Sequence, residues 1–345
     1  MKKMLALLLA LVMVLSLAAC ASSQPAAAST ETAETTKTTE PAAEESAEAP
    51  AESGKTYTVG VCQLVQHEAL DAATQGFIDA LKEELGDAVT VDVQNASGDS
   101  VNCGTIVNGF VSKGVDLIMA NATPALTAAV SATADIPILG TSITAYGVAL
   151  DIDDFNGTVG GNVSGTSDLA DLQAQAHMIL DWFPETKTVG LLFCSAEPNS
   201  RYQIDEVRKA LEAQGVTCEE FAFTDSNDVS SVTQKAADFS DVVYIPTDNT
   251  AASNTEAIAN VLIPAGVPAV CGEEGLCRGC GVATLSISYY DLGVTTGKMA
   301  AKILKGGADI STMPVEYTDA TPKYNASVCE QLGITPLDGY EAIDG

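Results

Sequence analysis

The sequence predicts an α/β protein made of two Rossmann-like lobes, each built on a parallel sheet. From residue 57 onward, short segments rich in β-branched residues alternate with helical patterns of ten to fifteen residues, and this alternation is typical of βαβ units. The same order of segments returns about 130 residues later. A chain of 345 residues is also long enough to give each of two lobes a hydrophobic core.

The first half of the folded region predicts four strands separated by three helices. The strands are expected at Tyr57–Val61, Val89–Val93, Asp116–Ala120 and Ile136–Leu139, and the helices at about Ala72–Leu85, Cys103–Ser112 and Pro124–Ala132. Apolar residues at helical spacing, such as Leu70, Phe77 and Leu81, indicate the first helix.

The second half repeats this order. Its strands are expected at Thr188–Leu191, Thr217–Phe221, Asp241–Ile245 and Val267–Ala269, with a helix at Tyr202–Gln214 after the first of them. Because five elements recur in one order, we expect the lobes to share a topology. Ligands of open α/β sheets bind at the carboxyl ends of the strands, so the expected site is a cleft lined by the strand ends of both lobes.

A further stretch follows the second half. It predicts a strand at Ala283–Ile287, a helix at Gly293–Leu304 and a strand at Val315–Tyr317. The simplest arrangement returns the chain to the first lobe and then to the second, which makes a multi-crossover hinge. We therefore expect lobe 1 to comprise residues 55–163 and 284–310, and lobe 2 residues 164–283 and 311–345. Hinge closure is a common way to trap a small molecule.

The first 54 residues predict a targeting signal followed by a flexible tether. Residues 1–19 join two lysines to an uncharged apolar run too short to span a membrane, as in a signal peptide. The end of that run, LAAC at 17–20, resembles the lipobox of bacterial lipoproteins, which implies a lipidated Cys20; an ordinary secretory peptide with a chance cysteine is the alternative. Residues 20–54 lack aliphatic residues larger than alanine and predict a disordered acidic tether.

Charge and motifs exclude several classes of function. The net charge is −30, with 46 acidic against 16 basic residues, so nucleic-acid binding is not expected. Two histidines leave little room for a histidine-rich metal site. The sequence has no P-loop, nucleophile elbow, GxGxxG after the first strand or HExxH motif. We expect no enzyme activity and no cofactor.

Polar side chains follow several predicted strands, where a ligand would lie. His67 follows the first strand, and Thr123 and Pro124 follow the third. The free N–H groups at the start of a helix can bind a carboxylate. Alternatively, Thr123 is only the N-cap of this helix and Pro124 only its first residue, N1.

The second half offers matching groups. Asp248 and Asn249 occupy the loop equivalent to Thr123 and Pro124, and Asn199 and Ser200 occupy the loop equivalent to His67. Between the halves, Ser167 or Asp168 is expected to start a helix. Each of these groups has helix capping as its alternative role.

Three cysteines leave open a function as a metal-binding or redox protein. Cys277 and Cys280 form a single CxxC in a glycine-rich stretch that we interpret as a loop, with Cys271 nearby. A metal or redox role would need these thiols, although zinc usually requires a second pair of ligands.

Several runs together resemble one family. They are QHEALD at 66–71, NASGD at 95–99, ATPA at 122–125, GNVSGTSD at 161–168, EPNS at 197–200, PTDNT at 246–250 and ISYYDLG at 287–293. From Tyr57 to about Tyr317 the chain resembles the substrate-binding lipoproteins of ABC importers, which include tryptophan- and tyrosine-binding members. It departs from them at Glu68, where proline is usual, at Ala145-Tyr146 and at the CxxC motif.

The resemblance implies a type I periplasmic-binding-protein fold with a venus-flytrap cleft. It also implies a monomer held by lipid on the outer face of a bacterial membrane, which delivers its ligand to a permease with an ATPase. The implied ligand-binding residues are His67, Thr123, Pro124, Ser167, Asp168, Asn199, Ser200, Asp248 and Asn249.

The function expected from these residues is capture of a small zwitterion, with amino acids, aromatic ones included, as the first candidates. Thr123 and the Asn199-Ser200 turn would hold the carboxylate, and Asp168 or Asp248 the ammonium group. The alternatives are a ligand-sensing receptor ectodomain of the same fold and a cysteine-dependent metal or redox protein.

Overall fold

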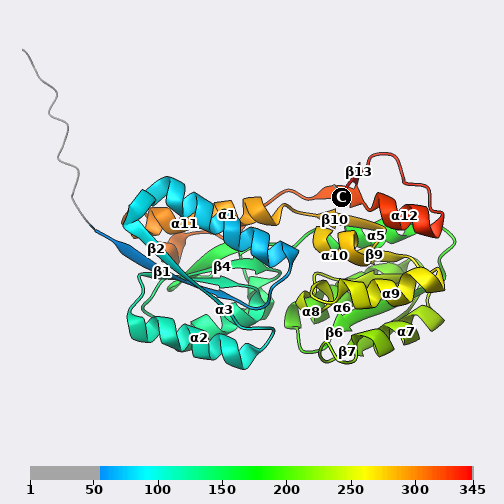
Figure 1. The fold of residues 1–345 in the computed structure, drawn as a ribbon, viewed down its shortest axis with the longest axis horizontal. Helices are drawn as coiled ribbons and strands as arrows, with labels where there is room; N and C mark the ends of the chain where they lie inside the picture. Colours follow the sequence, from blue (N-terminus) through cyan, green and yellow to red (C-terminus); the bar gives the residue numbers. More distant parts are fainter. Residues whose placement is uncertain (1–54, 344–345) are drawn as a thin grey trace, which may run out of the picture. The chain divides into compact units, whose positions relative to one another are not determined.

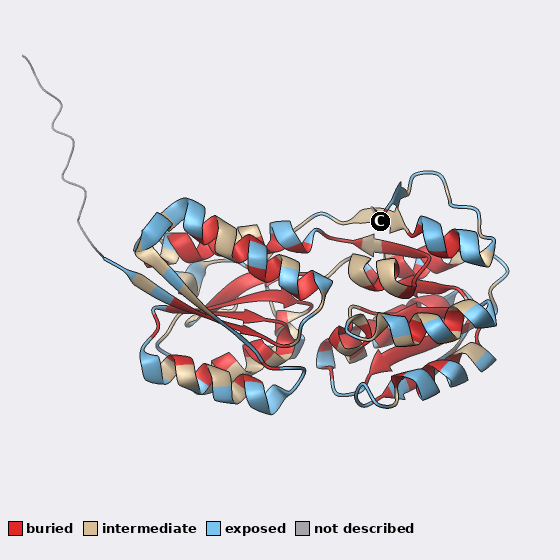
Figure 2. Cartoon of the chain, viewed as in Figure 1, coloured by how far each residue is buried: buried red, intermediate tan, exposed pale blue. Residues whose placement is uncertain are grey.

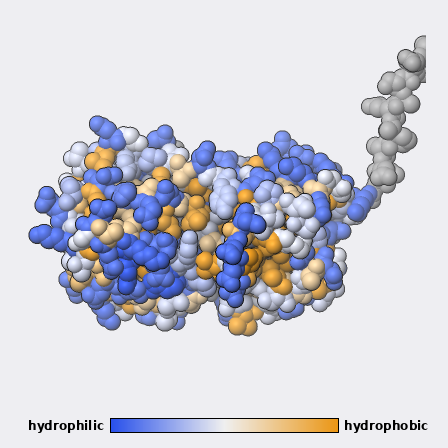
Figure 3. Space-filling view, turned by 180° about the vertical axis from the view of Figure 1, so that it is seen from behind, coloured by the Kyte–Doolittle hydropathy of each residue, from blue (hydrophilic) through white to orange (hydrophobic). Residues whose placement is uncertain are grey.

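The structure, a computed structural model, describes residues 55–343. The predicted signal peptide, the lipidation of Cys20 and the tether lie outside these residues. Within residues 55–343, no helix combines the length and the apolar character that crossing a membrane requires. Polar and charged residues cover most of the face seen in Figure 3, in keeping with the acidic composition.

Lobe 1 is built on a six-stranded sheet in the order β11-β5-β4-β3-β1-β2, in which every pair is parallel. Its strands are β1 (Tyr57–Gln63), β2 (Val89–Asn95), β3 (Leu117–Asn121), β4 (Ile138–Ile143), β5 (Val163–Ser167) and β11 (Glu316–Tyr317). The central strands are buried along their whole length, as expected for a parallel sheet covered on both faces.

Lobe 2 is built on a seven-stranded sheet in the order β13-β12-β10-β9-β8-β6-β7. Its strands are β6 (Thr188–Cys194), β7 (Thr217–Phe223), β8 (Val242–Ile245), β9 (Ala269–Cys271), β10 (Ala283–Ser286), β12 (Thr321–Tyr324) and β13 (Glu341–Ala342). Strands β7-β6-β8-β9-β10 repeat the order β2-β1-β3-β4-β5 of lobe 1. The predicted pair of related α/β lobes is confirmed.

Helices cover both faces of each sheet (Figures 1 and 2). In lobe 1 they are α1 (Glu68–Leu85), α2 (Ser100–Lys113), α3 (Thr123–Ala132), α4 (Tyr146–Ala149) and α11 (Tyr289–Leu304). In lobe 2 they are α5 (Leu172–Trp182), α6 (Pro198–Ala213), α7 (Val229–Phe239), α8 (Asn249–Ala252), α9 (Thr255–Ala265), α10 (Glu274–Cys280) and α12 (Ala326–Leu332). Two short 3₁₀ helices span Gly86–Ala88 and Ile310–Thr312.

The core of each lobe is divided by its sheet. In lobe 1, Phe77 and Met299 pack with one face of the sheet, and Val107 and Leu126 with the other. In lobe 2, α5, α6 and α12 contribute to one cluster, in which Trp182 is buried, and α7, α9 and α10 contribute to a second cluster. These layers hold the strand ends of both sheets in place.

Strand pairing moves three of the expected lobe boundaries. β5 pairs with β4 and β11 with β5, so both belong to lobe 1, whereas β10 pairs with β9 and β12 in lobe 2. The reason is that β5 contributes five buried residues to the lobe 1 sheet, and β10 contributes three buried residues to the lobe 2 sheet. The chain therefore crosses between the lobes three times, at residues 168–171, 287–288 and 318–320.

Helices α1 and α11 pack at unusually short range, and this requires glycine. A Cβ on Gly293 would lie 2.0 Å from the carbonyl oxygen of Ala73, and one on Gly76 would lie 2.1 Å from that of Tyr290. Neither backbone oxygen can move without shifting its helix. The glycines thus set the separation of two helices that are far apart in the sequence.

We expect Gly293→Ala to lower the free energy of unfolding by about 2 kcal/mol, because the methyl group must push the two helices apart. Urea denaturation measures this. The control is Gly109→Ala in α2, where an added Cβ meets nothing within 4 Å; it should raise stability by about 0.5 kcal/mol. Equal effects of both substitutions would show that the close approach is unimportant.

Candidate functional site

The carboxyl ends of the strands of both lobes meet around a small cavity, here called the inner cavity. Its volume is about 10 Å³, room for roughly one water molecule. Its lining residues are His67, Leu70, Ser142, Thr144, Asp168, Asn199, Thr247, Asp248, Asn249, Ala252, Glu273 and Tyr289. Both lobes contribute, as the repeated topology predicted.

Four buried polar atoms of this lining lack a hydrogen-bond partner among the described residues. They are Nδ1 of His67, Oγ of Ser142, Oδ1 of Asp168 and Oδ1 of Asn199. A buried polar atom without a partner costs about 1–3 kcal/mol, and such atoms are rare in native proteins. Four around one cavity indicate groups arranged to meet a ligand.

Asp168 is the lining carboxylate with a free oxygen. It follows β5 at the first crossing and is only 5% exposed. Its Oδ2 accepts a hydrogen bond of 2.9 Å from the Tyr289 hydroxyl, and its Oδ1 lacks a partner among the described residues. Burial raises the pKa of Asp168 to about 6, so the group is mostly ionised at neutral pH. It can accept hydrogen bonds from an ammonium group.

Asp248 also lines the inner cavity, but both of its oxygens are used. Oδ1 accepts from the backbone N–H of Ala251 at 2.8 Å, and Oδ2 accepts from that of Cys194 at 2.7 Å. Burial, with a smaller effect of nearby Glu197, raises the pKa of Asp248 to about 8. Of the two roles expected from the sequence, the geometry matches helix capping.

Glu273 is a third buried carboxyl group of the lining. It caps α10 by accepting from the backbone N–H groups of Gly275, at 2.6 Å, and Leu276. Burial raises the pKa of Glu273 to about 7. Because this cap starts a helix, the CxxC motif lies in α10 and not in the loop expected from its glycines.

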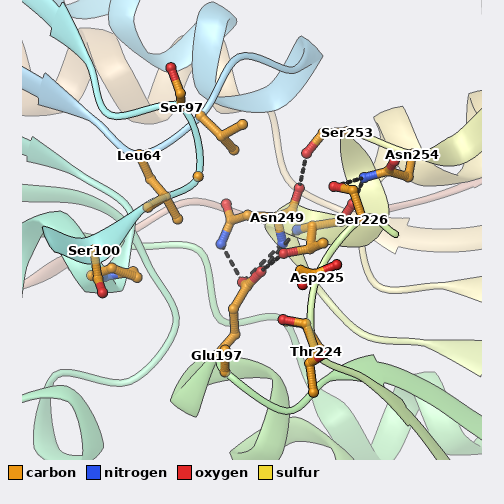
Figure 4. Close-up of a pocket in the computed structure, with 16 residues that line it drawn as sticks. Leu64, Ser97, Ser100, Glu197, Thr224, Asp225, Ser226, Asn249, Ser253 and Asn254 are labelled. Carbon is orange, nitrogen blue, oxygen red and sulfur yellow. Dashed lines mark hydrogen bonds between the residues drawn. The ribbon is translucent and has the colours of Figure 1, made fainter. Parts of the chain in front are cut away.

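A larger space, here called the outer pocket, adjoins the inner cavity and is also lined by both lobes (Figure 4). Its volume is about 300 Å³. Its lining residues are Leu64, Val65, Ser97, Gly98, Ser100, Pro124, Cys194, Ala196, Glu197, Thr224, Asp225, Ser226, Asn249, Thr250, Ser253 and Asn254. Asn249 lines both spaces and so stands between them.

Glu197 holds Asn249, the residue that lines both spaces, in place. Its carboxylate accepts from the backbone N–H and side-chain amide of Asn249, at 3.0 and 2.6 Å, and from the N–H and hydroxyl of Thr250, at 2.9 and 2.8 Å. Figure 4 shows the bonds that converge on it. Across the lobes, Nε2 of His67 lies 3.3 Å from Oδ1 of Asn249, and burial lowers the pKa of His67.

The structure brings most of the nine sequence-predicted residues to these two spaces. His67, Asp168, Asn199, Asp248 and Asn249 line the inner cavity, and Pro124 and Asn249 line the outer pocket. Thr123, Ser167 and Ser200 line neither of them. The Ser167 hydroxyl donates to the backbone oxygen of Thr144 at 3.0 Å, and Ser200 is fully buried in α6.

Two expected helix starts are wrong. Thr123 is not an N-cap, because Ala122, with a φ of 85°, precedes the helix and Thr123 is its first residue. Neither Ser167 nor Asp168 starts a helix, because α5 begins at Leu172 and is capped by Asp171. The shift leaves Asp168 outside helical structure and available to the cavity.

Sequence reasoning missed several lining residues. Ser142 lies in the last two residues of β4 and Thr144 directly follows that strand. Ser142 has a φ of 55°, which a local pattern does not reveal. Glu273 and Tyr289 come from helix starts after the second half. The only available signal was the presence of Tyr289 in the ISYYDLG run.

An ion pair joins the lobes beside the site. Arg278 of α10 donates from Nε to Glu68 of α1 at 3.0 Å, and its Nη2 lies 2.9 Å from Glu274. Glu68 stands where the resembled family usually has proline, and Arg278 lies inside the unusual CxxC.

The cysteines of this region are free and buried. Cys271, Cys277 and Cys280 are at most 1% exposed, and burial raises the pKa of Cys271 and Cys277. A raised pKa disfavours the reactive thiolate. Within residues 55–343, no cluster of three or more histidine, cysteine or acidic side chains has the arrangement of a metal site.

Comparison with known proteins identifies the family. Residues 58–339 match the model of ABC transporter substrate-binding proteins. The chain belongs to this family. A tyrosine-binding protein of Clostridioides difficile (strain R20291) is 32% identical over 276 residues, which cover 78% of this chain and 79% of the relative.

Two solved structures of similar proteins extend the match for this substrate-binding protein. A Streptococcus pneumoniae ABC domain in complex with L-Trp is 32% identical, with a TM-score of 0.79 over 84% of this chain and 100% of that one. A ligand-free, open substrate-binding protein with adhesive properties from Clostridium difficile is also 32% identical, with a TM-score of 0.64 over 84% and 99%. The predicted type I periplasmic-binding-protein fold is confirmed.

Proposed function

We propose that this substrate-binding protein is an extracytoplasmic lipoprotein of an ABC importer that captures an amino acid between its lobes. One observation carries the proposal: four unpartnered polar atoms from both lobes line the inner cavity. A ligand that pairs all four would offset their desolvation cost and hold the lobes together. The tyrosine-binding relative and the relative holding L-Trp support an amino acid as the ligand.

Asp168 is the proposed partner of the ligand ammonium group, assisted by Asn199. The Asn199 amide nitrogen donates to Glu197 and to the backbone oxygen of Thr247, both at 3.2 Å. These two acceptors fix the amide orientation, so its free atom is an oxygen that suits an ammonium group. This role replaces the carboxylate contact expected from the sequence, and the Ser142 hydroxyl is then the proposed donor to the ligand carboxylate.

The lobe arrangement supports capture by closure. At the same 32% identity, the L-Trp complex superposes better on this chain than the open, ligand-free relative does, with TM-scores of 0.79 and 0.64. The inner cavity is too small for a whole amino acid. We therefore propose that the lobes separate to admit the ligand and close around it.

Calorimetric titration of the purified protein with the twenty amino acids, with nucleosides and with sugars tests the proposal. Micromolar binding of an amino acid, about −8 kcal/mol, is the expected result, together with a thermal shift. If no amino acid gives heat or a thermal shift, the proposed ligand class is wrong.

Membrane attachment through Cys20 is part of the proposal and has its own test. Cells given radiolabelled palmitate should label the wild-type protein but not a Cys20→Ser variant, and only the wild type should sediment with membranes. A labelled or membrane-bound variant would contradict lipidation at this residue.

We expect Glu68→Gln to weaken amino-acid affinity two- to fivefold, because it removes an ion pair that is made only when the lobes are together. The effect is small since Glu68 is 51% and Arg278 34% exposed. Titration at low salt measures it, and 0.5 M salt should reduce the difference.

The matched control is Glu84→Gln. Glu84 pairs with Lys305 at 2.7 Å with similar exposure, but both belong to the α1 and α11 region of lobe 1. Its substitution should leave affinity unchanged. Equal losses in the two variants would mean that the Glu68 pair has no special role in closure.

A further inference from the structure

We propose that the cleft also takes aromatic amines, which carry an ammonium group and an aromatic ring but no carboxylate, and that it binds them more tightly than the matching amino acids. The inference rests on the proposed function, because it keeps Asp168 as the partner of the ligand ammonium group. It adds a second chemical class of ligand, in which the ammonium group and the ring are recognised and a carboxylate is not required.

A third space, here called the aromatic pocket, adjoins the inner cavity beside Asp168. Its volume is about 590 Å³, and Thr144 lines both spaces. The apolar and aromatic part of its lining includes Tyr146, Phe155, Leu169, Tyr202 and Tyr317. The rings of Tyr146 and Phe155 stack with their centroids 6.3 Å apart. Because aromatic rings bind well against other rings, the ring of a ligand whose ammonium group lies at Asp168 has its place here.

The charged residues that line the three spaces are all acidic. They supply eight carboxyl groups, from Glu197 and Asp225 in the outer pocket, Asp168, Asp248 and Glu273 in the inner cavity, and Asp151, Asp153 and Asp154 in the aromatic pocket. Within residues 55–343, no lysine or arginine lines any of these spaces. His67 adds no charge near neutral pH, because burial lowers its pKa. A ligand with a net positive charge therefore suits the cleft better than a neutral zwitterion.

The helix starts beside the inner cavity, where a carboxylate could otherwise bind, already hold acidic residues of the chain. The N-cap residues of α6, α8 and α10 are Glu197, Asp248 and Glu273. Glu197 and Asp248 accept from the first N–H groups of α8, and Glu273 accepts from those of α10. In lobe 1, the first turn of α1 contains Glu68 and Asp71. A ligand carboxylate would meet a negative group at each of these helix starts.

Hydrogen bonding fixes His67 as a further acceptor in the inner cavity. The amide nitrogen of Asn249 donates to Glu197 at 2.6 Å, so Oδ1 of Asn249 is the atom that lies 3.3 Å from Nε2 of His67. Since that oxygen can only accept, Nε2 carries the hydrogen. In a neutral imidazole the other ring nitrogen is then an acceptor, and Nδ1 of His67 has no partner among the described residues.

The unpartnered atoms of the cavity lining thus match an ammonium group. Three of them are acceptors, namely Oδ1 of Asp168, Oδ1 of Asn199 and Nδ1 of His67, and a primary ammonium group has three N–H donors and no acceptor. The Ser142 hydroxyl is the single unpartnered donor of the lining, which is few for a carboxylate with two oxygens.

A carboxylate on the same carbon as the ammonium group would bring a cost that an amine avoids. The inner cavity, of about 10 Å³, has room for one water-sized group, and the ammonium group fills it. The carboxylate would then lie next to acids that already repel one another, since burial and, after it, the charge of Glu197 raise the pKa of Asp248 to about 8. An amine removes this added repulsion and keeps the contacts of the ammonium group and the ring.

Calorimetric titration of the full-length protein tests the inference with matched ligands. The pairs are tyramine with L-tyrosine and tryptamine with L-tryptophan, and 3-(4-hydroxyphenyl)propionate serves as the analogue that has the ring and the carboxylate but no ammonium group. Each amine should bind about tenfold more tightly than its amino acid. The propionate should give no heat, because it brings a negative charge and no partner for Asp168.

Glu273→Gln tests the cause of the preference. Measured at about pH 8, it should reduce the affinity ratio of tyramine to tyrosine about threefold, because it removes one carboxylate that a ligand carboxylate would face. The ratio is the readout, since a loss of stability would weaken both ligands alike. Asp135→Asn, at an exposed position between α3 and β4, is the control and should leave the ratio unchanged. An equal ratio in wild type and Glu273→Gln would contradict the proposed repulsion.

The outcomes separate this inference from the proposed function. If tyrosine or tryptophan binds and its amine binds no more tightly, the inference is overturned and amino-acid capture stands. If the amines bind and no amino acid does, the inference stands and the proposed ligand class is wrong. If the propionate binds as tightly as tyrosine, the ammonium group is not recognised and the inference fails. If none of these compounds nor any other amino acid binds, both fail.

Discussion

An Asp168→Asn variant is expected to bind the proposed amino-acid ligand about 100-fold more weakly than the wild type and yet to be more stable without ligand. The amide has no charge to attract the ligand ammonium, and hydrogen bonds to charged groups contribute about 1.5–3 kcal/mol each. The same change removes a buried carboxylate whose burial raises its pKa to about 6. We expect a gain of about 1–2 kcal/mol in the free energy of unfolding at pH 7.5.

Asparagine suits this position sterically, because its oxygen can still accept from the Tyr289 hydroxyl as Oδ2 of Asp168 does. Calorimetry measures the affinity, and urea denaturation measures the stability. The control is Asp135→Asn, at an exposed position in the loop between α3 and β4, which should change neither quantity. Loss of affinity together with loss of stability would indicate that Asp168 is a structural residue, and unchanged affinity would place the ammonium group elsewhere.

The second large effect is a fall in stability as the pH rises. Burial raises the pKa of Asp168 to about 6, of Glu273 to about 7 and of Asp248 to about 8, above the ordinary values of 3.8 and 4.5. Between the unfolded and folded pKa of each group, the folded protein binds more protons than the unfolded chain. These three groups therefore make the free energy of unfolding decrease with pH, by several kcal/mol in total between about pH 4 and pH 8. His67, whose pKa is lowered by burial, acts in the opposite direction below about pH 6.5, because there the unfolded chain binds more protons at this group.

Urea denaturation at pH 4.5, 6 and 8 without ligand measures this slope. General repulsion among the many acidic residues acts in the same direction, so a variant is needed to separate the two causes. Asp168→Asn should flatten the curve between pH 4 and pH 6 and leave the part above pH 7 unchanged. A stability that is constant or rises across this range would contradict the ionisation of these groups in the folded protein.

The repeated strand order could be predicted because it depends on local patterns. Segments such as Tyr57–Val61 and Thr188–Leu191 show β-branched content and are followed by helical spacing, whatever they pair with. The lobe assignments of β5, β10 and β11 could not be predicted in this way. They depend on which sheet edge each strand pairs with, and pairing across long sequence distances has no local signal.

The site shows the same contrast between features that follow from local sequence and features that depend on distant contacts. Asp168 and Asn199 could be proposed because polar residues after buried strands lie at the carboxyl edge of a parallel sheet. The separate tasks of the carboxyl groups could not be foreseen, because they depend on which backbone N–H groups face them. Both oxygens of Asp248 accept hydrogen bonds from backbone N–H groups, whereas one oxygen of Asp168 has no partner among the described residues.

The exchange of segments between the lobes also orders events during synthesis. Helix α11 covers the face of lobe 1 that contains Phe77 and Met119, and β11 closes the edge of the same sheet. Both segments lie near the end of the chain, and chains emerge from the ribosome N-terminus first. Lobe 1 therefore begins first and can be completed only after nearly all of the protein has been made. Until then the face that contains Phe77 and Met119 lacks the helix that covers it in the folded protein.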